Sequence, residues 1–256
     1  MDRRHFLAAA AALPLVAPHA GPAAAQSAPA RTYTPVPGAW RTFEVTTRLE
    51  ILFAGPDTKA WIPVPALTSD WQQSLPSTWS GNVRDAAVFT DPTYGAKMVR
   101  AAWADSEASP VIEVVTRVRT RDRSVDWAKK SAPVLAADER ALITKAQHCR
   151  AEVWLAGYGW VAMDPADVAK VMRQETASWI KDPKDALVAP VYGALFGAWE
   201  GNWMGYNDAH DLALPGTAGA PVPFLMYPQA EARGERVDSL DPDTFKYRIT
   251  AREITA

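Results

Sequence analysis

The chain has 256 residues, of which 48% are hydrophobic and 22% are charged, a composition typical of a globular protein with a core of its own. Its formal net charge is −2, from 27 Lys and Arg against 29 Asp and Glu. This charge balance excludes the strongly basic surface that nucleic acids or anionic membranes attract. Eleven Trp and 21 Pro favour strands, turns and aromatic packing over long helices.

Residues 1–25 are predicted to be an export signal and not part of the fold. Arg3 and Arg4 begin a twin-arginine pattern, an apolar run follows at residues 8–16, and a small-residue cleavage site comes after it. The apolar run is shorter than the roughly 20 residues of a membrane-spanning helix, and Pro14 interrupts it. We therefore expect a periplasmic or secreted protein without a membrane span in its mature chain.

The next part of the chain is predicted to be a linker followed by a β-sandwich. Residues 26–38 are rich in Ala, Pro, Ser and Thr without periodicity, which favours a linker. Residues 39–125 form the predicted sandwich domain, because strand patterns recur there without a helix between them. The pattern predicts strands at residues 43–52, 59–65, 86–89, 97–103 and 111–120.

Residues 126–147 are predicted to be a short helical connector, since residues 135–143 combine an acidic start with helix-forming residues. The remainder, residues 148–256, is predicted to be a mostly antiparallel sheet. Its expected elements are a hairpin at residues 148–165, helical turns at 166–172 and within 175–192, and strands at 223–227 and 245–254.

The predicted hairpin carries the residue types that favour chemistry. A Gly-Tyr-Gly turn joins its two strands, and Asp164 and Pro165 end the second one. The first strand alternates, so we expect one polar face and one core face. The polar face would carry His148, Arg150, Glu152 and Trp154, and the core face Cys149, Ala151, Val153 and Leu155.

The length of the loop decides which side chains share a face. If residues 155–159 form a five-residue loop, Trp154 pairs with Trp160 and Arg150 with Asp164. A loop of two or four residues would turn Asp164 to the opposite face.

In the five-residue case His148 lies diagonally beside Asp164, with their backbones about 7–8 Å apart. A carboxylate beside a His fixes the imidazole tautomer and stabilises the imidazolium, as in a general acid/base pair. We therefore predict that the Asp164 carboxylate lies within hydrogen-bond reach of the His148 ring.

The hairpin sequence HCRAEVWLAGYGWVAMDP, residues 148–165, resembles the His-to-Asp segment of bacterial transglutaminase-like proteins, which have a papain-type Cys-His-Asp triad. The resemblance implies Cys-dependent acyl transfer or hydrolysis of amide bonds on a protein or peptide, without a cofactor. His148 would be the general acid/base and Asp164 its orienting residue. The implied fold is α+β and β-dominated, an N-terminal β-sandwich followed by the antiparallel β-half of a transglutaminase-like core.

The chain departs from that family at the nucleophile. In the family the nucleophilic Cys lies upstream, in a helical subdomain before the His strand, and here no Cys precedes His148. Cys149 is a poor substitute, because adjacent residues on a strand project to opposite faces. The resulting hypothesis is a transglutaminase-like protein that keeps His148 and Asp164 but has lost catalysis.

Two alternatives stay open. The chain is either a non-catalytic binding module of the cell envelope or an internally shortened version of a longer enzyme. No metal site is expected, since residues 207–211 are predicted to be an ordinary polar loop. The absence of a glycine-rich phosphate loop argues against a nucleotide cofactor. Trp199, Trp203 and Tyr206 are expected to pack internally and not to form a stacking platform.

Overall fold

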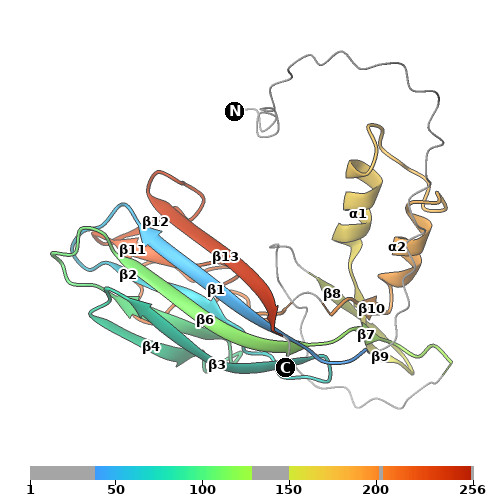
Figure 1. Ribbon diagram of the computed structural model, residues 1–256, viewed down its shortest axis with the longest axis horizontal. Coiled ribbons are helices and arrows are strands. Elements are labelled where there is room, and N and C mark those ends of the chain that lie inside the picture. The colour runs from blue at the N-terminus through green and yellow to red at the C-terminus, as the bar shows by residue number, and fades with distance from the viewer. Residues whose placement is uncertain (1–37, 129–149, 202–203, 255–256) are drawn as a thin grey trace, which may run out of the picture. The chain divides into compact units, whose positions relative to one another are not determined.

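The computed structural model describes residues 38–128, 150–201 and 204–254, and the structural statements below concern these residues. Strands dominate, and the sheets are antiparallel, which confirms the β-dominated α+β prediction. Two sheets contain most of the strands (Figure 1). The four-stranded sheet has the spatial order β13 (Phe245–Ile254), β1 (Arg41–Ile51), β6 (Val111–Thr120), β3 (Gln72–Gly81). The five-stranded sheet has the order β12 (Glu235–Val237), β11 (Gln229–Ala232), β2 (Lys59–Val64), β5 (Lys97–Ala102), β4 (Asp85–Thr90).

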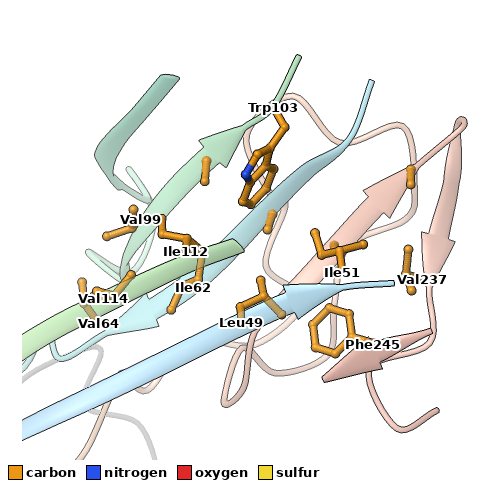
Figure 2. Packing of buried hydrophobic residues seen from close by; sticks show 14 residues of the cluster. Leu49, Ile51, Ile62, Val64, Val99, Trp103, Ile112, Val114, Val237 and Phe245 are labelled. Carbon is orange, nitrogen blue, oxygen red and sulfur yellow. The ribbon is translucent and has the colours of Figure 1, made fainter. Parts of the chain in front are cut away.

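The main hydrophobic core lies between these two sheets. Alternate residues of each strand point inward, as the period of two requires. Leu49 on β1 and Ile112 on β6 meet Ile62 on β2 in this core, together with Trp103 at the end of β5 (Figure 2). The face-to-face packing confirms the predicted β-sandwich.

A second cluster covers the outer face of the five-stranded sheet. Trp61 of β2 is fully buried there with Leu212 and Leu225, and its indole N–H donates to the Pro215 carbonyl at 3.0 Å. A strand was predicted at residues 223–227, but none forms. Leu225 of that segment is buried by packing onto the sheet and not by pairing with it, whereas Phe224 is 38% exposed.

Strand β3 was not predicted from the sequence. It is polar and contains Pro76, and its pairing with β6 shifts between Ser74 and Ser77. Such features are tolerated at the edge of a sheet, where one side of the backbone needs no partner. β3 is such an edge strand.

The C-terminal strands belong to the sandwich, which differs from the prediction that residues 148–256 form a sheet of their own. β13 forms where it was expected, but it pairs with β1 over its whole length. β11 and β12 form a hairpin that was not predicted, and β11 adds to β2. Arg233 and Gly234, both with positive φ, make the two-residue turn that this hairpin needs.

The hairpin region consists of short elements. These are β7 (Arg123–Ser124), β8 (Ala151–Leu155), β9 (Gly159–Met163), α1 (Pro165–Gln174), α2 (Ala189–Ala194) and β10 (Ala198–Trp199). β8 pairs with β9, and β10 pairs with β7. The predicted helix at residues 135–143 lies outside the described residues, as do the predicted export signal and most of the linker. Within the described ranges, no helix is long and apolar enough to cross a membrane.

Candidate functional site

The register of the hairpin is the one that the five-residue loop predicts. Trp154 pairs with Trp160, and Leu155 pairs with Gly159. The two indole rings meet edge to face, with centroids 5.7 Å apart. Extended by one pair beyond the ladder, the same register sets Arg150 opposite Asp164, on the same face of the hairpin.

Asp164 is fully buried at the junction of β9 and α1. Its Oδ1 accepts a hydrogen bond from the backbone N–H of Asp167 at 3.0 Å, and Pro165 occupies the first helical position. This is the arrangement of an N-cap, in which a side-chain oxygen satisfies an N–H that the helix cannot. The local sequence Asp-Pro therefore starts α1 and fixes the Asp164 carboxylate.

Arg150 is a charged partner of Asp164. Its Nε lies 2.7 Å from Asp164 Oδ2, and its Nη2 lies 2.8 Å from Glu200 Oε2 and 3.5 Å from Asp167 Oδ2. The Arg150 side chain is only 4% exposed. Since a buried guanidinium needs compensating charge, these carboxylates hold it and connect β8, α1 and the end of β10.

A second ion pair lies on the same face, between Glu152 and Arg123 of β7. Arg123 also donates to the Trp160 carbonyl at 3.0 Å, and its guanidinium lies 4.8 Å from the ring centre of Trp199. Ala162, opposite Glu152 in the register, packs with Trp199 in a small core cluster. The polar face of the hairpin is thus largely enclosed.

The predicted core face of β8 is less buried than expected. Ala151, Val153 and Leu155 are all partly exposed, whereas Arg150 and Glu152 are nearly covered. The reason is that Trp199 and its neighbours pack onto the Ala162 side of the hairpin. The prediction that β8 turns its apolar face to a closed core is therefore wrong for these residues.

His148 and Cys149 lie outside the described residues. The contact between His148 and Asp164 stays a prediction, and so does the orientation of the Cys149 thiol. What the structure brings together is Asp164 with Arg150, Asp167 and Glu200. The alternation and loop length predict Arg150 opposite Asp164, but they do not mark Arg150 as its ion-pair partner. No sequence signal pointed to Glu200.

A pocket of about 220 Å³ borders the hairpin, and its lining includes Arg123, Asp126, Tyr158 and Trp160. Ligand pockets for small molecules usually measure ~300–1,000 Å³. This pocket is therefore smaller than the usual site for a small molecule.

Of the lesser candidates, some are buried and one pair is exposed. The Asn207 amide is buried and donates to the Leu225 carbonyl at 3.0 Å. His210 Nδ1 lies 3.1 Å from Asp211 Oδ2, exposed to solvent. Trp199 and Tyr206 are buried, which confirms internal packing for these two, and burial raises the pKa of Tyr206 to about 12. Trp203 lies outside the described residues.

Comparisons with known proteins find limited similarity. No protein-family model matches the chain. A protein of Haemophilus influenzae described as uncharacterized is 43% identical over 122 residues, which cover 46% of this chain. That match spans only 32% of the relative's own length. Among solved structures, a candidate cysteine protease from Cytophaga hutchinsonii aligns with 16% identity and a TM-score of 0.31, over 41% of this chain and 36% of that one.

Proposed function

We propose that this chain is a transglutaminase-like protein in which His148 and Asp164 keep the positions of a general acid/base and its orienting carboxylate, without covalent turnover. The observation that supports the proposal best is the hairpin register. The Trp154–Trp160 pairing turns Asp164 to the face on which the alternation of the strand sets His148. An even-length loop would have separated them.

The surroundings of Asp164 support the absence of turnover. A carboxylate orients and stabilises an imidazolium best when its charge is not already matched by another cation. Here Arg150 lies 2.7 Å away, and the Asp167 N–H takes the other oxygen. Asp164 thus has the contacts of a structural N-cap and ion-pair partner as well as the position of an orienting residue.

The nucleophile is the second part of the proposal. The sequence has one cysteine, Cys149, directly beside His148. Adjacent side chains on a strand project to opposite faces, so we expect the imidazole of His148 not to accept the proton of the Cys149 thiol. Without that transfer the covalent step of the family has no activated first atom.

The test is an assay for amide chemistry on a glutamine-containing peptide, with ammonia release and incorporation of a primary amine as the two readouts. We expect the wild type, His148→Ala and Cys149→Ser all to show no activity above background in either readout. Turnover by the wild type that His148→Ala removes would overturn the claim of inactivity. If Cys149→Ser also removed it, Cys149 would be the nucleophile.

A non-catalytic binding module of the cell envelope is the second candidate. The observation that favours it is the buried ion pair between Asp164 and Arg150. A structural role of this kind does not require catalytic activity. In this case a partner protein or peptide binds the described domain, and His148→Ala leaves the affinity unchanged. A binding affinity that depends strongly on pH near the usual His pKa would count against this candidate.

We also propose that the protein is exported through its twin-arginine segment. Fractionation of bacteria that express the chain, compared with a variant carrying Arg3→Lys and Arg4→Lys, tests this. The wild type should appear in the periplasmic fraction or the medium, and the variant in the cytoplasm. Equal distribution of the two would contradict the proposal.

A further inference from the structure

In the part of the chain that the structure describes, the sandwich has four edge strands, and three of them carry features that discourage pairing with another chain. Edge strands are usually protected by prolines, bulges, charges or short length. β3 contains Pro76 and the register shift beside it. β12 has only three residues. β13 presents exposed charges at Lys246, Arg248 and Arg252.

β4 is the exception. Its sequence DAAVFT has no proline or lysine, and its pairing with β5 runs without a bulge from Asp85 to Thr90. Val88 and Phe89 are 45% and 40% exposed. No other strand of the described chain pairs with the outer side of β4, which ends the five-stranded sheet. This is the combination that marks a strand for pairing with another chain.

The backbone groups on that outer side can be assigned. The Asp91 N–H donates to the Ala96 carbonyl at 2.8 Å, which makes residues 91 and 96 a hydrogen-bonded pair in the antiparallel ladder. Because hydrogen-bonded and non-hydrogen-bonded pairs alternate, the Phe89 backbone also faces β5. The N–H and C=O groups of Ala86 and Val88 therefore point to the open side.

We propose that this edge binds a second copy of the chain, by antiparallel pairing of β4 with β4 around a two-fold axis at Ala87. Twofold pairing is self-complementary by symmetry. It sets Val88 of each copy opposite Ala86 of the other, so that the open N–H and C=O groups of both residues bond reciprocally. On the face of the sheet that is turned toward the core, the larger Val88 side chain of one copy then lies beside the smaller Ala86 side chain of the other.

The charge on β4 does not oppose pairing with a second copy. Asp85 is the only charged residue of β4, and in this register it lies opposite Phe89 of the other copy. Like charges directly opposite one another, which destabilise a strand pair, are thereby avoided. On the same face, Arg100 Nη1 lies 3.7 Å from Asp85 Oδ2 within each copy, so the carboxylate has a counter-ion close by.

The experiment measures the mass of the purified chain by sedimentation equilibrium over a wide range of concentration. We expect the wild type to approach twice the chain mass as the concentration rises. Val88→Lys adds a charge at the open edge, and Val88→Pro removes an N–H that β5 does not use, so both should stay monomeric. Leu240→Lys is the matched control, since Leu240 is 66% exposed and outside β4, and it should behave as the wild type does.

Circular dichroism shows whether the Val88 variants are folded. A wild type that is monomeric throughout the range would overturn the proposal. So would a folded Val88 variant that dimerises with unchanged concentration dependence, or assembly beyond the dimer. None of these outcomes depends on His148 or Asp164, so the result is independent of the proposed function.

Discussion

Arg150 Nε lies 2.7 Å from Asp164 Oδ2, and both side chains are almost completely buried. The two residues are opposite one another in the extended register of the β8–β9 hairpin. Asp164 also begins α1, so one ion pair joins the hairpin to the helix that follows it. Loss of either partner should disturb both elements.

We expect Arg150→Met to destabilise the protein by about 3–5 kcal/mol, the usual result of leaving a buried charge uncompensated. Arg150→Lys keeps the charge but not the planar guanidinium, whose Nε lies beside Asp164 and whose Nη2 donates to Glu200, so the loss of stability should be smaller. Chemical denaturation of the variants measures both values. Arg248→Met, which changes an exposed arginine on β13, is the control. A loss for Arg150→Met no greater than that of the control would show that the pair contributes little.

The two roles of Asp164 can be separated by comparing Asp164→Asn with Asp164→Ala. Asn removes the negative charge but remains a good N-cap, whereas Ala loses the cap as well. Asp164→Ala should therefore be less stable than Asp164→Asn by about 1 kcal/mol. Equal free energies of unfolding for the two variants would mean that the bond to the Asp167 N–H does not stabilise α1.

The sequence predicted those parts of the fold that local patterns encode. Strands with β-branched alternation, such as β1 and β6, formed where expected. β3 was missed because an edge strand with Pro76 lacks such a pattern. The pairing of β13 with β1 joins residues about 200 apart in the chain. Local periodicity can predict each strand but not which strand it pairs with.

The same distinction holds at the candidate site. Loop parity and alternation were enough to set Arg150 opposite Asp164, because a hairpin is a local structure. Glu200 reaches Arg150 only because β10 pairs with β7 and lies beside the hairpin. A carboxylate in a turn-rich aromatic segment gives no sign of such a contact in the sequence.

The two valines that face each other across the hairpin should respond differently to truncation. Val153 pairs with Val161, but Val161 is fully buried and Val153 only partly. We expect Val161→Ala to cost roughly 2 kcal/mol, from lost burial and a residual cavity, and Val153→Ala less than half of that. Denaturation of the two variants under the same conditions tests this order. The reverse order would mean that Val153 is buried more deeply in solution.

Glu231 on β11 should make the stability depend on pH. Burial, the largest single influence, opposes ionisation of this carboxyl. Hydrogen bonds from the Thr217 hydroxyl and the N–H groups of Ala218 and Gly219, with the charge of Arg236, together outweigh burial and lower the pKa of Glu231. A group whose pKa is lowered on folding stabilises the protein above its pKa in the unfolded chain, and that contribution disappears as the pH falls through the folded value.

Glu231→Gln removes this titration. At neutral pH the variant should be less stable than the wild type, because an amide cannot replace the charge that faces Arg236 at 3.2 Å and the buried Lys59 at 3.7 Å. As the pH falls below the ordinary Glu value of about 4.3, the wild type loses its advantage and the two free energies of unfolding should converge. Denaturation curves at a series of pH values measure the difference. A gap that stays constant or widens toward acid would contradict the lowered pKa and would assign the stabilising role of Glu231 to its shape alone.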